Sequence, residues 1–190
     1  MLLEVDFSVN ETSTFTVVGS RTFRCFKKME TQDDNQKKTH QIKTHAQSIV
    51  NQPSDVSQLY SCHAWLTCEN FLIVATQLGE VIVCDDNAEF HSTVKDAPIH
   101  VMKQQIAIEC IAVYSRGFAL GGENGHIFLY KYTNDNHSPF EFQAKYLIKS
   151  VGDLKENNRV TGICISPTQE DKLICALSTN TIHSIKLVKE

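Results

Sequence analysis

Short apolar segments recur along the whole chain, and residues such as Gly, Asn, Asp and Ser separate each segment from the next. In some of them apolar and polar positions alternate, as in residues 2–7, whereas no window keeps the 3.6-residue period of a long helix. Runs of this kind are typical of β-strands bounded by turns. The pattern therefore predicts an all-β protein.

The expected strands share a length of about four to eight residues and flanking turn residues. In chain order they are 2–7, 15–18, 22–26, 61–66, 71–76, 81–84, 90–93, 108–114, 117–120, 127–132, 142–148, 160–166, 173–177 and 181–187.

These strands fall into four similar triplets, at 2–26, 61–84, 108–132 and 160–187. Each triplet reads strand, short turn, strand, tight turn, strand. The tight second turns contain residues that tolerate a positive φ or make side-chain turns. They are Gly19-Ser20, Leu78-Gly79, Glu123-Asn124-Gly125 and Thr179-Asn180. The sequence therefore predicts a repeated antiparallel meander.

The second and third triplets carry the most informative motifs. His63-Ala64-Trp65-Leu66, the apolar run 71–76 and Leu78-Gly79-Glu80-Val81-Ile82-Val83 resemble strand a, strand b and the hairpin into strand c of a WD repeat. Residues 109–119 and 125–130 repeat the theme, whereas Cys84-Asp85 and Tyr130-Lys131 stand where a WD repeat has Trp-Asp. The order of these pieces is similar to that in the cilia- and flagella-associated WD-repeat family.

The resemblance implies a partial WD40-type β-propeller, about four blades of four-stranded antiparallel sheet. The triplets recur at intervals of roughly 46 to 60 residues, near or above the ~40 to 45 of a WD40 blade. We expect blade units at approximately 1–28, 58–95, 106–150 and 158–190, with outer fourth strands at 90–93 and 142–148. The polar segment 29–57 is expected to be a mobile loop.

Four blade units are fewer than the seven blades of the propellers that ciliary WD proteins resemble. We expect the ring to be completed by a separate polypeptide or by further sequence of a longer chain. An exposed strand edge pairs readily with another chain. Leu2, Val5, Ile185 and Leu187 are therefore the candidate contacts at the open edges.

Composition and charge narrow the partners. The 190 residues carry a net charge of -4, with 42% hydrophobic residues, which allows a real core and gives no general attraction to nucleic acid or anionic lipid. No apolar stretch reaches the ~20 residues needed to cross a bilayer. Seven cysteines, odd in number and without a C-x-x-C pair, suit a reducing cytoplasm.

One segment departs from this overall acidity. Five lysines lie between residues 27 and 45 against three acidic residues. They are Lys27, Lys28, Lys37, Lys38 and Lys43. A solvated loop is one interpretation, and contact with an acidic surface such as the microtubule is the other.

No arrangement of residues points to catalysis. Cys110 lies in an apolar strand, which favours packing over a nucleophile served by His126. His40, His45 and His63 with Cys62 miss the spacing of a zinc site. The run 121–125 lacks the Lys-Ser/Thr and the helix of a phosphate loop, which leaves a hairpin turn. We expect no enzyme activity, no cofactor and no metal.

Trp65 is the single tryptophan. In strand a of a blade, an aromatic ring packs between adjacent blades, and we favour this core position over a binding hot spot.

The resemblance also implies a function and a place in the cell. A family member is a non-catalytic scaffold in the cytoskeleton of motile cilia. It helps to assemble or regulate the inner dynein arms beside their regulatory complex and the tubulin doublet. A general cytoplasmic WD40 adaptor unrelated to cilia is the alternative.

Overall fold

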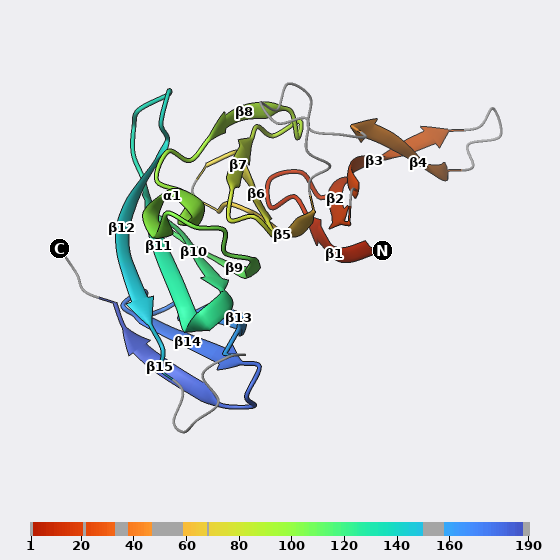
Figure 1. Ribbon diagram of the computed structural model, residues 1–190. Coiled ribbons are helices and arrows are strands. Elements are labelled where there is room, and N and C mark those ends of the chain that lie inside the picture. The colour runs from red at the N-terminus through yellow and green to blue at the C-terminus, as the bar shows by residue number, and fades with distance from the viewer. Residues whose placement is uncertain are drawn as a thin grey trace.

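The computed structural model of the 190-residue chain describes residues 2–20, 22–32, 38–46, 59–67, 69–149 and 158–187. Within them the chain forms four antiparallel sheets in chain order, which Figure 1 shows arranged one after another. The first three sheets have four strands each and the fourth has three. In every sheet the spatial order of the strands equals their order in the sequence. The fold is thus a succession of meanders, and the predicted all-β class is confirmed.

The first sheet contains β1 (Leu2–Phe7), β2 (Thr14–Gly19), β3 (Thr22–Gln32) and β4 (Lys38–Ala46). The second contains β5 (Tyr60–Trp65), β6 (Leu72–Thr76), β7 (Val81–Cys84) and β8 (Phe90–Thr93). The third contains β9 (Ile108–Tyr114), β10 (Gly117–Gly122), β11 (His126–Tyr132) and β12 (Phe140–Leu147). The fourth contains β13 (Val160–Ile165), β14 (Lys172–Leu177) and β15 (Ile182–Lys186). The helix α1 (Pro98–Met102) connects β8 to β9, and the 3-10 turn η1 (Glu123–Gly125) connects β10 to β11.

The tight turns form where the sequence places residues that accept a positive φ. Gly79 has φ +87° in the β6–β7 hairpin, and Asn124 and Asn180 have φ values of 56° and 60° in the equivalent turns of the third and fourth sheets. Asn is one of the few residues with a side chain that adopts this region readily. These predicted turns are therefore confirmed.

The sheets pack face to face around their first strands, since β1 contacts β5, β5 contacts β9 and β9 contacts β13. Three apolar clusters separate successive sheets. Trp65 and Leu72 lie in the cluster between the first and second sheets. Phe118 and Phe128 lie between the second and third, and Leu129 lies between the third and fourth. The strands β6 and β7 of the second sheet and β10 of the third are buried along their whole length. Because they are covered on both faces, their sequences are almost continuous apolar runs.

One feature differs from the sequence prediction. The polar segment 29–57 is not a loop throughout, because β3 continues to Gln32 and Lys38–Ala46 forms β4. The two strands pair along eight residues of β4 and project as a hairpin from the first sheet (Figure 1). Hydrophobicity did not reveal this pairing because the hairpin is largely exposed. The rest of the predicted loop, 33–37 and 47–58, lies outside the described residues.

The fourth sheet has three strands, as in the triplet predicted at 160–187, and no described strand lies beyond β15. The second to fourth sheets otherwise fall inside the expected units at 58–95, 106–150 and 158–190, whereas the first sheet extends past the expected boundary at 28. No helix among the described residues is long and apolar enough to span a membrane.

Candidate interaction surfaces

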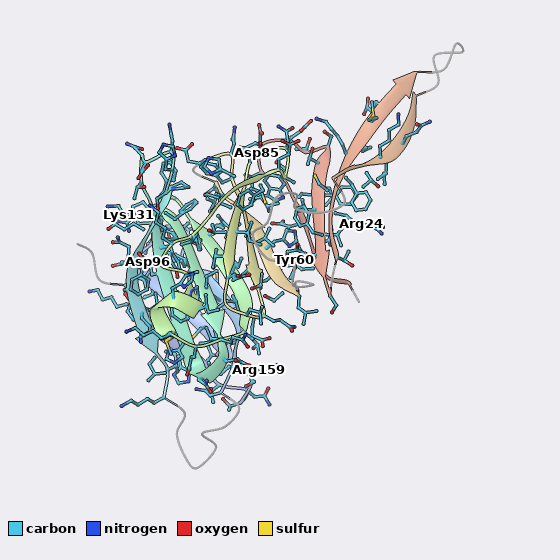
Figure 2. All side chains as sticks on the ribbon, turned by 45° about the horizontal axis from the view of Figure 1, so that its top comes forward. Arg24, Tyr60, Asp85, Asp96, Lys131 and Arg159 are labelled. Carbon is cyan, nitrogen blue, oxygen red and sulfur yellow. The ribbon has the colours of Figure 1, made fainter. Side chains whose placement is uncertain are left out.

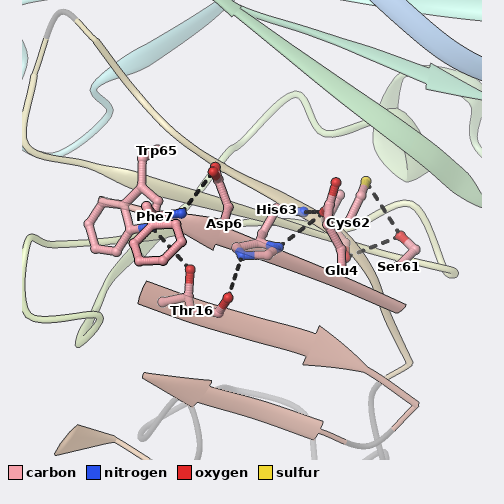
Figure 3. Close-up of polar contacts among 9 residues, drawn as sticks. Glu4, Asp6, Phe7, Thr16, Ser61, Cys62, His63 and Trp65 are labelled. Carbon is pink, nitrogen blue, oxygen red and sulfur yellow. Dashed lines mark hydrogen bonds and ion pairs between the residues drawn. The ribbon is translucent and has the colours of Figure 1, made fainter. Parts of the chain in front are cut away.

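A buried polar cluster joins the first sheet to the second (Figure 3). The imidazole of His63, on β5, has Nδ1 3.1 Å from Glu4 Oε2 and Nε2 3.2 Å from the carbonyl oxygen of Thr16. The His63 backbone N–H donates to the same Glu4 oxygen at 2.7 Å. Both partners of the ring carry acceptor oxygens, so the ring bridges the side chain of Glu4 on β1 and the backbone of Thr16 on β2.

Trp65 completes this cluster two residues further along β5. Its indole Nε1–H donates to Thr16 Oγ1 at 3.1 Å, and both side chains are buried. The ring lies in the core between two sheets, which confirms the core interpretation of Trp65. Since buried polar groups need specific partners, these bonds fix the orientation of β1 and β2 against β5.

That orientation leaves the opposite face of the first sheet uncovered. Side chains alternate along a strand, so Glu4 of β1 faces the second sheet while Val5 and Phe7 point away from it. Val5 and Phe7 are each 60% exposed. They lie in register with Val17 and Phe15 on β2.

Aromatic rings form a row across this face. The ring centroids of Phe7 and Phe15 are 5.6 Å apart, and those of Phe15 and Phe26 are 5.0 Å apart in a stacked arrangement. The row crosses three adjacent strands, β1, β2 and β3. We call this surface, made of Val5, Phe7, Phe15, Val17 and Phe26, the aromatic face. Exposed apolar patches of this kind mark sites of protein association.

The basic residues predicted from the sequence are divided by the hairpin of β3 and β4. Lys27 lies in register with Lys43, but its Nζ is 2.7 Å from Glu11 Oε1. The hydrogen bond from Lys27 is the main reason why the pKa of Glu11 is lowered. Lys28 is the neighbour of Lys27 along β3 and therefore points to the other side of the ribbon. The lysines thus flank the hairpin and do not form one patch.

The remaining two lysines are less fully described. Lys38 begins β4 in register with Gln32, and Lys37 lies outside the described residues. Contact of these five lysines with a partner stays a prediction.

At the other end of the molecule, the fourth sheet also exposes one face. Ile174 and Ile182 are 47% and 76% exposed. Cys164, in register with Ile174, is also exposed. This second apolar surface is made of Cys164, Ile174 and Ile182.

The four residues predicted at the open edges have different surroundings. Leu2 begins β1 in register with Gly19, and Val5 is part of the aromatic face. The side chains of Ile185 and Leu187 pack into the cluster between the third and fourth sheets, and Leu187 is 4% exposed. What β15 leaves open among the described residues is its backbone edge.

A groove of about 290 Å³ lies beside that edge, against the third sheet. Leu129, Ala144 and Leu187 supply its apolar part, and the rings of Tyr114 and Tyr146 flank it. Its polar lining consists of Arg116, Lys131 and Gln143. Lys131 and the first sheet's Arg24 lie at opposite ends of the molecule (Figure 2).

The surroundings of Cys110 and His126, the two residues that the sequence offers for chemistry, favour a structural role. The thiol of Cys110 is 3.4 Å from the carbonyl oxygen of Val160, and burial raises its pKa to about 12. Burial also lowers the pKa of His126. A thiol with a raised pKa is a poor nucleophile. No group of three or more His, Cys, Asp or Glu side chains within the described ranges is arranged to hold a metal ion.

Sequence reasoning did not find the aromatic face or the groove cations. The available signal was in β2, where Phe15 and Val17 stand on one alternating face and Val18 on the other. Apolar residues on both faces are typical of strands that are buried on both faces. Arg116 and Lys131 carry no such signal, because only the packing of sheets brings them together.

Solved structures with this arrangement define its class. The chain superimposes on the Cps50 (Swd1) β-propeller domain of Myceliophteria thermophila with a TM-score of 0.68 at 11% identity, covering 99% of this chain and 58% of that one. With Chaetomium thermophilum Sqt1 the TM-score is 0.66 at 14% identity, over 96% of this chain and 43% of the other. A chain of the mitotic checkpoint complex gives 0.64 at 16% identity, over 97% and 47%. The fold is therefore a partial WD40-type β-propeller, as predicted.

Two relatives within this class have related sequences. The chain is 30% identical over 161 residues to cilia- and flagella-associated protein 57 C of Tetrahymena thermophila, which covers 82% of this chain and 12% of that protein. It is 25% identical over 122 residues to protein 57 A of the same organism, which covers 64% and 9%. The similarity to cilia- and flagella-associated protein 57 confirms the resemblance seen in the sequence. The chain spans about one eighth of the first relative's length, and no family model matches it.

Proposed function

We propose that this chain is a non-catalytic scaffold segment that works in the axoneme of motile cilia, where it helps to assemble or regulate the inner dynein arms. The aromatic face carries the proposal, because it offers a rigid apolar surface for another protein. The names of the relatives, cilia- and flagella-associated proteins, support the location. The WD40-type fold, typical of scaffolds, supports the absence of catalysis.

Rigidity is what makes the aromatic face suitable for binding. Phe15 lies at its centre, stacked on Phe26 and held on a strand whose other face is bonded to Trp65. Aromatic side chains contribute large contact areas with few rotatable bonds. A partner that covers Phe7 and Val5 therefore gains buried apolar area at little cost in conformational entropy.

Two kinds of sheet could pack on the aromatic face, and either would extend the ring of sheets. One is a further blade, if the chain is part of a longer polypeptide, and the other is a sheet of a separate chain. In either case the contact resembles that between the first and second sheets, with apolar side chains of two sheets packed face to face.

The hairpin of β3 and β4 supplies a second proposed contact. Lys28 and Lys43 are exposed on opposite sides of the ribbon. Together with Lys27, Lys37 and Lys38 they would approach an acidic surface such as the tubulin doublet. Such contacts are long-ranged and weaken with salt.

The test combines location with binding. A tagged copy of the chain and a Phe7→Ser, Phe15→Ser variant are expressed in ciliated cells, and axonemes are isolated by detergent extraction. We expect the parent chain to stay with the axoneme and the variant to be lost from it. Leu147→Ser is the matched control, because Leu147 is a 49% exposed apolar residue of the third sheet outside the aromatic face.

The alternative function is a cytoplasmic WD40 adaptor with no role in cilia. A parent chain distributed through the cytosol, with none on the axoneme, would establish that alternative and overturn the proposal. Retention of the double variant at the parent's level would show that the aromatic face is not the contact. Neutralising the five lysines tests the hairpin separately, and unchanged binding to doublets would contradict its role.

A further inference from the structure

The hairpin of β3 and β4 continues beyond the rest of the first sheet. Lys27, opposite Thr14, is the last residue of β3 in register with β2, and from Lys28 onward β3 is in register with β4 alone. Residues 27–32 and 38–43 thus form a two-stranded ribbon, which projects from the sheets in Figure 1 and Figure 2. The ribbon lies between two strands of one sheet and is not an open end of the ring.

Packing between the sheets does not account for the ribbon. In the second and third sheets, residues 85–89 and 133–139 join the third strand to the fourth without any such extension. No described side chain of the ribbon belongs to the apolar clusters between the sheets. Its exposed side chains are therefore available to another molecule.

Both faces of the ribbon expose an apolar side chain. Lys28 and Ile42 are directly opposite one another on the first face, and Met29 is opposite Gln41 on the second. Ile42 is 64% exposed and Met29 is 42% exposed. A two-stranded hairpin without a core is marginally stable in water, and burial of these side chains against a partner would stabilise it.

Each face also carries one exposed lysine. Lys28 is on the first face, and Lys43, opposite Lys27, is on the second. Within the part of the chain that the structure describes, neither exposed lysine has an ion pair, whereas Lys27 is paired with Glu11. Glu30, exposed on the first face, is the acidic residue of the ribbon. The described side chains of the ribbon thus carry more cations than anions, and an acidic partner complements them.

We propose that the ribbon binds a flexible acidic segment of a partner protein. Its carboxylates would approach Lys28 and Lys43, and its apolar side chains would cover Ile42 and Met29. A rigid acidic surface could reach one of the two lysines but not both, because they lie on opposite faces, whereas a flexible chain can wrap from one face to the other. The inference rests on the hairpin contact of the proposed function and names the kind of partner that makes it.

The acidic turn between β7 and β8 shows why a second copy of this chain fits less well. Asp85 accepts hydrogen bonds from the backbone N–H groups of Asn87 and Glu89, each at 2.9 Å, and these bonds hold the turn in one conformation. A turn fixed in this way would meet one face of the ribbon and leave the other exposed.

The experiment measures binding of an acidic peptide to the 190-residue chain. The probe is a fluorescein-labelled peptide of about 20 residues with the repeat Glu-Val-Glu-Gly, which has no fixed structure of its own. We expect saturable binding by fluorescence anisotropy. Lys28→Glu and Lys43→Glu should each weaken it about fivefold, because both faces take part. Lys145→Glu, at an exposed lysine of β12, is the matched control, with less than about a twofold change.

A gain of affinity separates a direct contact from unfolding. Glu30→Gln removes the acidic side chain two residues from Lys28 and should tighten peptide binding about twofold. A second peptide, with Lys in place of Glu, should bind the parent weakly and should prefer the variant that combines Lys28→Glu with Lys43→Glu. An unfolded variant cannot gain affinity in this way. Hydrogen exchange of the ribbon amides should slow when the acidic peptide is added.

Several results would overturn the proposal. They are the absence of saturable binding, equal binding of the two peptides by the parent, and a loss of binding for only one of Lys28→Glu and Lys43→Glu. Self-association of the chain that depends on these two lysines would assign the ribbon to a second copy. Isolated doublets separate this inference from the proposed function: if they retain the parent through the lysines while the peptide does not bind, the partner is a folded acidic surface, and only the flexible segment is ruled out.

Discussion

Trp65 donates its indole N–H to Thr16 Oγ1 across the boundary between the first and second sheets. The hydroxyl and the indole nitrogen are 3.1 Å apart, and Trp65 and Thr16 are 1% and 0% exposed. Because both side chains are buried, each group depends on the other as its partner among the described residues.

Replacing Thr16 with Val keeps the shape of the side chain and removes the acceptor. The buried Trp65 N–H then loses its partner, which costs about 1–3 kcal/mol of unfolding free energy. Urea denaturation followed by tryptophan fluorescence measures this loss. Thr44→Val on the exposed β4 strand is the control, with a change within about 0.5 kcal/mol. Equal stabilities of Thr16→Val and the parent would contradict the bond.

The position of the first sheet depends on this bond and on the hydrogen bonds between His63 and Glu4. Sequence reasoning placed Trp65 in the core because an aromatic ring in strand a of a blade packs between adjacent blades. It could not name Thr16 as the partner of Trp65 or Glu4 as the partner of His63, since these lie 49 and 59 residues away and polar residues in strands commonly face solvent.

A contact between two loops, made by Glu170 and Ser115, predicts that the stability of the protein depends on pH. Glu170 accepts hydrogen bonds from the hydroxyl and from the backbone N–H of Ser115, the latter at 2.7 Å. The Ser115 hydroxyl is the main reason why the pKa of Glu170 lies below its ordinary value. Because the folded-state pKa is below the unfolded-state pKa, the stabilisation is present above the ordinary carboxyl range. It is lost as the pH falls through the folded-state value.

Glu170→Gln should therefore be less stable than the parent at neutral pH, with the difference narrowing as the pH falls from about 6 to about 3. Thermal unfolding at a series of pH values measures it. The stability difference between Ser115→Ala and the parent should narrow in the same way as the pH falls. Ser166→Ala, in the neighbouring loop, is the control, and its stability difference from the parent should stay constant over the pH range. A difference for Glu170→Gln that is constant over the pH range would show that the carboxylate charge is not involved.

The repeat of meanders was predictable from the sequence because each strand is short, apolar and bounded by turn residues such as Gly79 and Asn180. The hairpin of β3 and β4 was not, because Lys27, Lys28 and Lys43 read as a solvated loop. Its strands are held by backbone pairing, and side-chain hydrophobicity does not report pairing in an exposed ribbon. The groove beside β15 was harder still to predict, since its lining residues Arg116, Lys131 and Leu187 come together only when the third and fourth sheets pack.

Thiol reactivity maps the exposed face of the fourth sheet. Cys164 is exposed, whereas Cys25 and Cys84 are buried, and burial raises their pKa values to about 11 and about 12. A thiol reagent at pH 8 should modify Cys164 quickly and these two only after unfolding. Cys68 lies outside the described residues, so the measurement uses a Cys68→Ser background.

In that background, mass spectrometry of peptides identifies the modified residue. Cys164→Ser should remove the fast phase, and Cys25→Ser should leave it unchanged. A partner or blade that covers Ile174 and Ile182 should slow the reaction of Cys164 and thereby report its own binding. Fast modification of Cys25 in the folded chain would contradict the packing of the first two sheets.

Alanine substitutions at Gly79 and Gly162 should have different effects on the free energy of unfolding. Gly79 has φ +87°, and a Cβ there would lie 2.8 Å from the carbonyl oxygen of Ile106. Alanine is strained at this φ and clashes with backbone that cannot move freely, so Gly79→Ala should lose about 1–3 kcal/mol of unfolding free energy. A Cβ at Gly162 would meet only the Cβ of Ala176, at 3.9 Å.

Gly162→Ala should therefore be neutral, or more stable by about 0.5–1 kcal/mol, because alanine reduces the conformational entropy of the unfolded chain. Chemical denaturation of both variants beside the parent measures the contrast. Since β6 and β7 of the second sheet pack on both neighbours, Gly79→Ala should also weaken contacts on either side of it. Equal stabilities of the two variants would mean that the β6–β7 turn does not require a positive φ.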